Sequence, residues 1–234
     1  MELLVSAINI DEAKQAVKGG ADILDVKNPK EGSLGANFPG VIREISDFAD
    51  EDMIVSTTIG DVPYKPGTVS LAALGCAVSG SNYVKVGLYG PENYDEAMEV
   101  MEAVVRTVKE YDESITVVAC GYADAYKVGS VEYMDIPEVA HDSGCDLAML
   151  DTYIKDGHRL TDHLNSEQLK EFTDISHSYG LKVALAGSVN ANDIEMLESI
   201  NCDIMGVRGF VCTGNDRNNG TIDHKLVEQL KANI

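Results

Sequence analysis

Residues 3–28 have the sequence LLVSAINIDEAKQAVKGGADILDVKN, which contains the three parts of a strand–helix–strand unit. The apolar runs Leu3–Ile8 and Asp22–Asn28 predict two strands, because valine, isoleucine and leucine follow one another without the strict alternation of a half-exposed strand. Between them, Asp11–Gly19 predicts a helix that begins at a capping aspartate and ends at a glycine. Strands joined by a helix lie parallel in a sheet, and such connections are right-handed. This unit therefore predicts an α/β fold.

The same alternation continues through the chain. Further strands are predicted at Met53–Ile59, Tyr83–Tyr89, Ile115–Tyr122, Asp146–Ile154, Lys182–Val189 and Asp203–Val211, and further helices at Glu92–Tyr111, Asn165–Tyr179, Asn190–Asn201 and Asp223–Asn233. Most strands start about 30 residues after the preceding one, the length of one strand–helix–strand unit. Eight strands in 234 residues fit a closed (β/α)8 barrel better than an open Rossmann-type sheet, and no GxGxxG motif opens the first helix. We predict a single TIM-barrel domain spanning residues 1–234.

The composition limits the partners of this barrel. The 39 acidic residues outnumber the 18 basic ones, which gives a formal net charge of −21. This balance argues against nucleic acid and against an anionic membrane as partners, since both favour a basic protein surface. An anionic substrate therefore has to be held by local positive potential inside a site. No apolar run approaches the 18 residues of a membrane-spanning helix, so we expect no membrane partner.

Cysteine usage and the first residues indicate a cytoplasmic protein. The five cysteines are spread along the chain without a CxxC motif, which favours reduced, buried thiols. The first apolar run has no basic leader, so we interpret it as a strand and not as a signal peptide.

No cysteine or carboxylate completes a tetrahedral metal set beside His158 and His163, and we expect neither a metal nor a cofactor. Small barrels commonly assemble through their outer helices, so we expect a homo-oligomer.

Charged residues inside the predicted strands are the main functional signal, because buried strands carry almost no charge. Asp25 and Lys27 alternate with aliphatic residues in the second strand, and Lys85 does so in the fourth. The aliphatic residues suit the outer face, which packs on helices, so the charged ones are predicted to point into the barrel. Asp151 ends the inward face of the sixth strand, with Lys155 four residues further on. Inward residues of alternate strands share layers, so we expect these side chains to meet in one cavity.

Lysines inside a barrel suggest a reaction between a neutral amine and a carbonyl group of the substrate. An unperturbed lysine is neutral only about once in 2,500 molecules at pH 7, but burial or a second cation lowers its pKa. The neutral amine then attacks an aldehyde or ketone, and neighbouring aspartates orient the lysines and accept protons. The residues alone therefore predict an aldolase-like site. The alternative is a set of structural salt bridges, which would be a costly way to gain only stability.

Candidates for phosphate binding follow the last two strands. Gly187 and Ser188 lie at the end of the seventh predicted strand and Gly209 at the end of the eighth, where many barrels bind phosphate through backbone N–H groups. Alternatively, these residues only form the tight turns that any barrel needs. Arg208 either clamps the phosphate or forms an ion pair with a neighbouring helix. The loop Gly32–Asn37 either covers the site, binds a phosphate or is simply a long turn.

Several motifs together resemble one enzyme family. They are DVKNPKEGSLGA at 25–36, YVKVGLYG at 83–90, DTYIKDG at 151–157, AGSVN at 186–190 and GVRGFVC at 206–212, so the resemblance covers the whole chain. The chain resembles the (5-formylfuran-3-yl)methyl phosphate synthases of methanofuran biosynthesis. These lyases join two molecules of glyceraldehyde 3-phosphate with loss of phosphate and water.

The resemblance implies a role for each charged residue. Lys27 would form a Schiff base and Lys85 would accept a proton, with support from Asp25, Asp151 and Lys155. From the residues alone, two other functions stay open. One is a lysine-dependent aldolase or triose-phosphate isomerase-like enzyme with the same phosphate loops. The other is a non-catalytic protein that binds a phosphorylated metabolite, which leaves the two inward lysines unexplained.

Overall fold

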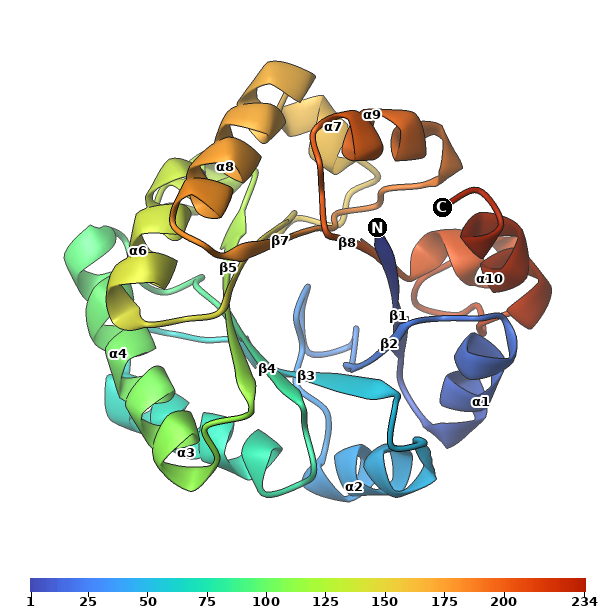
Figure 1. Cartoon of the computed structure of the whole chain (residues 1–234), viewed down its shortest axis with the longest axis horizontal. Helices are drawn as coiled ribbons and strands as arrows, with labels where there is room; N and C mark the ends of the chain where they lie inside the picture. Colours follow the sequence, from blue (N-terminus) through green and yellow to red (C-terminus); the bar gives the residue numbers. More distant parts are fainter.

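A computed structural model describes residues 1–234, and its eight parallel strands close into a barrel in the order β1 to β8 (Figure 1). The strands are β1 (Glu2–Ala7), β2 (Ile23–Val26), β3 (Ile54–Asp61), β4 (Tyr83–Gly87), β5 (Thr116–Tyr122), β6 (Leu147–Asp151), β7 (Lys182–Leu185) and β8 (Ile204–Val207). Strand β1 pairs with both β2 and β8, so the sheet has no free edge. The predicted TIM barrel is confirmed.

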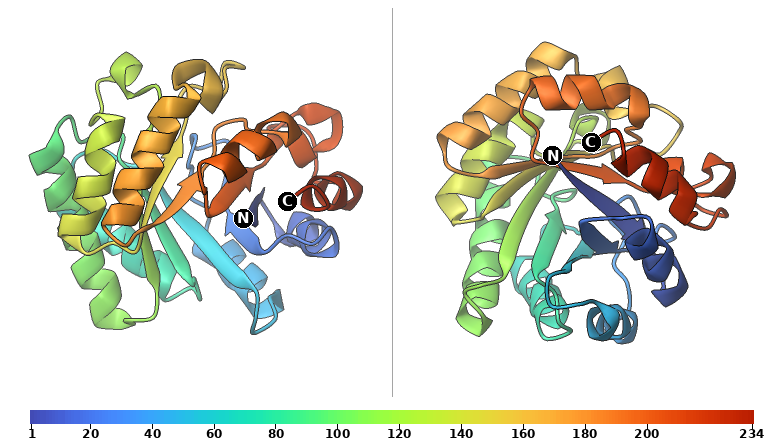
Figure 2. Two further views of the ribbon diagram at one scale, coloured as in Figure 1. Left: turned by 45° about the horizontal axis from the view of Figure 1, so that its top comes forward. Right: turned by 45° about the vertical axis from the view of Figure 1, so that its right-hand side comes forward.

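Helices surround the barrel on its outside (Figures 1 and 2). They are α1 (Ile10–Lys18), α2 (Pro39–Phe48), α3 (Pro66–Ala77), α4 (Tyr94–Tyr111), α5 (Ala125–Val128), α6 (Ile136–Ser143), α7 (Leu160–His163), α8 (Ser166–Ser178), α9 (Ile194–Ser199) and α10 (His224–Lys231). Four short 3-10 turns accompany them, namely η1 (Tyr133–Asp135), η2 (Ala191–Asp193), η3 (Gly209–Val211) and η4 (Thr213–Asn215). The helix predicted at 190–201 is therefore shorter, because its first residues form η2.

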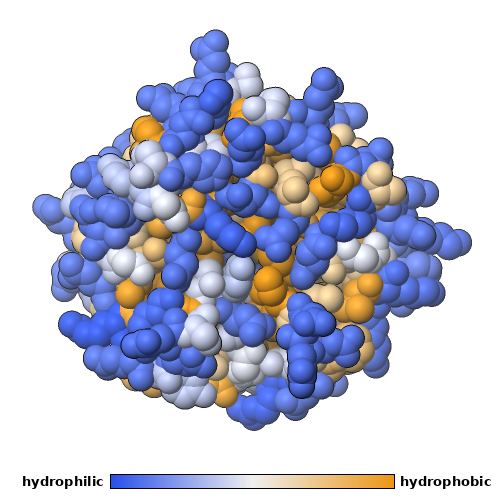
Figure 3. Space-filling model, in the orientation of Figure 1, coloured by the Kyte–Doolittle hydropathy of each residue, from blue (hydrophilic) through white to orange (hydrophobic).

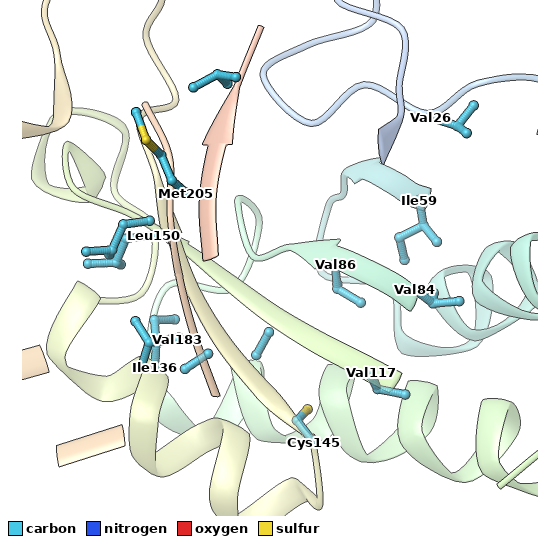
Figure 4. Packing of buried hydrophobic residues seen from close by; sticks show 14 of the residues in the cluster. Val26, Ile59, Val84, Val86, Val117, Ile136, Cys145, Leu150, Val183 and Met205 are labelled. Atoms are coloured by element: carbon cyan, nitrogen blue, oxygen red, sulfur yellow. The ribbon is translucent and has the colours of Figure 1, made fainter. Parts of the chain in front are cut away.

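Two apolar cores lie on the two faces of the strands. The outer core contains 55 buried residues between strands and helices, including Val26 and Val84 (Figure 4). The inner core contains 12 buried residues inside the barrel, including Ile23. Asp25 shares the face of Ile23, and Lys85 alternates with the outer residues of β4, so both charged side chains point into the barrel. The inward direction predicted for them is confirmed.

Some strands end earlier than predicted, and the early ends shape the mouth of the barrel. After β2, the backbone N–H of Asn28 donates to Gly35 O at 2.8 Å, so the chain leaves the sheet. After β6, the backbone N–H of Tyr153 donates to the Asp124 carboxylate at 2.7 Å. Lys27 therefore stands just beyond its strand, at the C-terminal end where barrel enzymes carry their sites.

The surface is mainly hydrophilic. Hydrophilic residues cover most of the face in Figure 3, and apolar residues show in the gaps between them.

All five cysteines are buried and free, as predicted, and burial raises the pKa of Cys145 and Cys202 to about 12. These thiols are therefore unreactive at neutral pH. None of the helices combines the length and apolarity needed to cross a bilayer.

Candidate active site

Lys85 and Asp25 form an ion pair inside the barrel. Lys85 Nζ lies 2.5 Å from Asp25 Oδ1, and both side chains are almost completely excluded from solvent. Ser6 Oγ donates a 2.8 Å hydrogen bond to the other oxygen of Asp25. Burial alone would raise the pKa of Asp25, but the charges of Lys85 and Lys27 outweigh burial and hold this pKa below its ordinary value. Asp25 is therefore a carboxylate at neutral pH.

Lys27 is a buried lysine without a partner. Its backbone N–H donates to Ala7 O at 3.1 Å, and the residue is 7% exposed. No hydrogen bond or ion pair holds its ammonium group. Burial lowers the pKa of Lys27 to about 8, although Asp151 and Asp25 oppose the fall. With that pKa, about one molecule in ten carries the neutral amine at pH 7.

Asp151 and Lys155 form a second ion pair at the end of β6. Lys155 Nζ lies 2.6 Å from Asp151 Oδ1 and 3.1 Å from Thr152 Oγ1. Burial alone would raise the pKa of Asp151, but Lys155 and Lys27 outweigh burial and lower it. Asp151 is buried whereas Lys155 is partly exposed, so the pair connects the interior of the barrel with its mouth.

A cavity of about 510 Å³ opens at this end of the barrel, a size usual for small-molecule sites. Seven of the eight predicted site residues line it, namely Asp25, Lys27, Asp151, Lys155, Gly187, Ser188 and Gly209. Lys85 is 1% exposed and lies behind Asp25, so it reaches the cavity only through that carboxylate. No group of three or more histidine, cysteine or carboxylate side chains is arranged to hold a metal ion.

The loops after β7 and β8 present unpaired backbone donors. The N–H groups of Gly187, Ser188 and Val189 donate no hydrogen bond within the protein. Gly209 and Phe210 begin the 3-10 turn η3, so their N–H groups have no partner within that turn. All five residues line the cavity. The φ angles of Gly187 and Ser188 are +104° and +58°, which turns the chain sharply after β7. A β-carbon at position 187 would lie 3.1 Å from the backbone nitrogen of Thr152, so glycine fits there best. Converging free N–H groups are suitable donors for phosphate oxygens.

Arg208 forms an ion pair with helix α1. Its Nη1 lies 2.7 Å from Glu12 Oε2 on α1 and donates to Ser6 O at 2.8 Å. Its Nε donates to the backbone carbonyl of Arg217 at 2.8 Å. Of the two roles that the sequence left open, the structure shows the ion pair. Arg208 ties the end of β8 to α1 and to the loop that carries Arg217.

The comparison with known proteins bears directly on this site. A family model described as 4-HFC-P synthase matches residues 3–231. The chain belongs to this family. Two curated relatives named (5-formylfuran-3-yl)methyl phosphate synthase, from Methanobrevibacter smithii and Methanocaldococcus jannaschii, are each 61% identical over 231 residues. Each alignment covers 99% of this chain and 98% of the relative. The family predicted from the sequence motifs is confirmed.

Solved structures similar to this 4-HFC-P synthase family member share its fold. A 3-hexulose-6-phosphate synthase matches with a TM-score of 0.68 and 17% identity over the whole of both chains. A phosphoribosyl anthranilate isomerase from Thermus thermophilus matches with a TM-score of 0.65 and 15% identity, over 100% of this chain and 98% of the other. At such identities the likeness shows the TIM-barrel fold alone.

The loop Gly32–Asn37 fills one side of the barrel mouth in this family member. Leu34 is fully buried in the inner core, and its N–H lies 3.2 Å from both carboxylate oxygens of Asp61. Ser33 Oγ donates to Thr152 O at 2.7 Å, across the ring of strands. No residue of this loop lines the cavity, so the loop covers the neighbouring part of the barrel interior.

The sequence did not reveal three polar residues at the mouth. The hydroxyl of Tyr122 on β5 bonds to Asp61 on β3, and burial raises the pKa of both groups. Tyr122 ends a predicted strand, so the alternation along that strand was a usable signal. Arg217 also lines the cavity, but it lies in the irregular loop between η4 and α10, where no periodicity indicates a direction.

Proposed function

We propose that this chain condenses two molecules of glyceraldehyde 3-phosphate to (5-formylfuran-3-yl)methyl phosphate in the cytoplasm, as a lyase of methanofuran biosynthesis. Membership of the 4-HFC-P synthase family supports the product. The mechanism rests on one observation above all. Lys27 is a buried, unpaired lysine at the cavity with a pKa lowered to about 8. Such an amine is a suitable nucleophile towards an aldehyde.

The first step is imine formation on Lys27. The neutral amine attacks the aldehyde carbon of one triose phosphate, and the resulting carbinolamine loses water to give a protonated imine. The Asp151–Lys155 pair influences the pKa of Lys27 and provides a proton for the departing water. The protonated imine then withdraws electrons from the neighbouring carbon, so no other electron sink is required.

The second step is proton removal from C2 of the bound triose, which converts the imine to an enamine. The family resemblance implies Lys85 as the proton acceptor. Lys85 lies behind Asp25, which lines the cavity and pairs with Lys85 at 2.5 Å. We therefore assign proton transfer to the Asp25–Lys85 pair, in which Asp25 exchanges protons with the substrate and Lys85 exchanges them with Asp25.

The enamine expels phosphate from C3, which leaves an enol whose C3 is nucleophilic. This C3 attacks C2 of the second triose phosphate after that molecule has isomerised to its keto form, because only this bond gives the branched carbon of the furan that carries CH2–O–phosphate. Cyclisation and dehydration then give the aromatic ring, and hydrolysis of the imine returns Lys27. The overall reaction balances when two triose phosphates yield one furan phosphate, one inorganic phosphate and two molecules of water. The free N–H groups at Gly187, Ser188 and Gly209 support the binding of one phosphate group.

A product assay tests this function. We expect glyceraldehyde 3-phosphate to give an ultraviolet-absorbing furan aldehyde, with one phosphate released per furan formed. A simple aldolase or isomerase would consume the triose phosphate without furan absorption, and a binding protein would not consume it. The Lys27→Ala variant should form furan roughly 1,000-fold more slowly or slower still. The matched control is Lys170→Ala, which removes an exposed lysine on α8 that pairs only with Asp174.

A further inference from the structure

Three arginines line the cavity, and one of them has no partner. Arg159 lies 2.7 Å from Asp193, and Arg208 lies 2.7 Å from Glu12. Arg217 forms no ion pair, and its Nε is buried without any hydrogen-bond partner. Leaving a buried donor unsatisfied costs free energy, so such a group inside a functional cavity indicates that a ligand completes it.

Arg217 lines the cavity beside the end of β8. The residue starts beside the loop after β8, since a β-carbon at Gly209 would lie 3.5 Å from Arg217 Cβ. The acidic groups that act on its charge most strongly are Asp151 on β6 and Asp61 on β3. The guanidinium therefore lies at the cavity within electrostatic reach of the carboxylates of Asp151 and Asp61. Burial lowers its pKa, but an arginine remains charged at neutral pH.

The two buried charges of Glu12 and Arg208 hold Arg217 in this position. Both side chains are 4% exposed, and Arg208 Nε donates to the backbone carbonyl of Arg217 at 2.8 Å. Arg208 also donates to Ser6 O at 2.8 Å, which fixes it to β1. The loop that carries Arg217 is thereby anchored to the barrel wall, and its guanidinium is placed before a ligand arrives.

We propose that Arg217 binds the phosphate group of the second triose phosphate, the one that does not form the imine. This inference rests on the proposed function, because only a reaction of two triose phosphates needs two phosphate sites in one cavity. The N–H groups after β7 and β8 provide one site. Lys27 is consumed by the imine and Lys155 is paired with Asp151, so Arg217 is the cation left for the other. Its planar guanidinium suits paired phosphate oxygens.

The test counts binding sites for glycerol 3-phosphate, which carries the phosphate but has no carbonyl group to react. Calorimetric titration should find two molecules bound per wild-type chain and one per Arg217→Ala chain. Arg217→Lys should retain the second site with at least tenfold weaker affinity. The matched control is Arg43→Ala, which makes the same change in net charge at an exposed position on α2 and should bind two.

Reaction with glyceraldehyde 3-phosphate provides the second readout. Arg217→Ala should form the borohydride-trapped adduct on Lys27 within twofold of the wild type, while furan formation falls about 100-fold. Two unchanged sites in Arg217→Ala, one site in the wild type, or the loss of both sites in Arg217→Ala would each overturn the assignment. If the wild type makes no furan, the proposed function fails, and the glycerol 3-phosphate count still decides the role of Arg217.

Discussion

The two halves of the barrel mouth differ in how their polar groups are paired. Above β3 to β5, the loop Gly32–Asn37 fills the ring, and Asp61 accepts hydrogen bonds from Leu34 N–H and the Tyr122 hydroxyl. Above β6 to β8 and the first two strands, the cavity is open. The unpaired groups lie there, namely Lys27, Arg217 and the N–H groups after β7 and β8.

We therefore assign the half of the mouth with paired polar groups to stability and the half with unpaired groups to substrate binding. A buried donor without a partner costs free energy, so a stable fold pairs its polar groups wherever no ligand enters. At the strand ends the closed half meets that condition and the open half does not, although Ser56 Oγ, deeper on β3, is also buried without a partner. In a chain with a net charge of −21, unpaired cations gathered at one cavity also provide the local positive potential that an anionic substrate requires.

The largest expected effect comes from removing the unpaired lysine. Lys27→Ala should lower the rate of furan formation roughly 1,000-fold or more, because no other group at the cavity replaces the imine-forming amine. The free energy of unfolding should not fall, since the variant no longer buries an unpaired charge. Steady-state kinetics and urea unfolding measure the two effects. A Lys27→Ala variant that forms furan at the wild-type rate would contradict the assignment of the imine to Lys27.

The next largest effect comes from unpairing a lysine that the fold has paired. Asp25→Asn leaves Lys85 buried without its carboxylate and should lower the free energy of unfolding by about 4 kcal/mol. The double variant Asp25→Asn/Lys85→Met should recover at least half of this loss. Urea unfolding of the three proteins gives the comparison. A loss below about 1 kcal/mol in Asp25→Asn would show that the pair does not determine stability.

The lowered pKa of Lys27 should also make the stability of the protein depend on pH. The pKa of Lys27 is about 8 in the folded chain and 10.5 when unperturbed, so between these values the unfolded chain binds more protons. Stability should therefore rise with pH across this window, by about 3 kcal/mol from Lys27 alone, and this gain is absent below pH 8. Lys27→Met removes the contribution. Urea unfolding should show its advantage over the wild type at pH 7 shrinking towards pH 10.5, and a constant difference would contradict the lowered pKa.

The smallest expected effect concerns the phosphate loop. Ser188 is exposed and has a φ of +58°, a conformation that glycine adopts more easily. Ser188→Gly should change the free energy of unfolding by less than about 1 kcal/mol, because relief of strain offsets the greater freedom of the unfolded chain. Furan formation should stay within twofold, since the proposed donor is the backbone N–H. A large loss of activity would instead assign the binding to the hydroxyl.

Local sequence patterns predicted the barrel and the direction of its inner charges. Asp25 and Lys85 interrupt aliphatic alternation, which is a property of one strand at a time. The early strand ends depend on non-local bonds such as that from Tyr153 to Asp124, 29 residues away. The role of Arg208 depends on Glu12, 196 residues away, and no local pattern carries that information. Arg217 was missed for the same reason, because its loop is placed by Arg208.

The imine on Lys27 is the central claim, and chemical trapping tests it most directly. The protein is incubated with glyceraldehyde 3-phosphate and borohydride, and the modified peptide is identified by mass spectrometry. We expect a reduced triose phosphate adduct on Lys27 that is absent from Lys27→Ala and unchanged in Lys170→Ala. If the triose phosphate is consumed and no lysine carries an adduct, the imine mechanism is wrong. Acid–base catalysis through Lys85 and the aspartates would then be the better explanation.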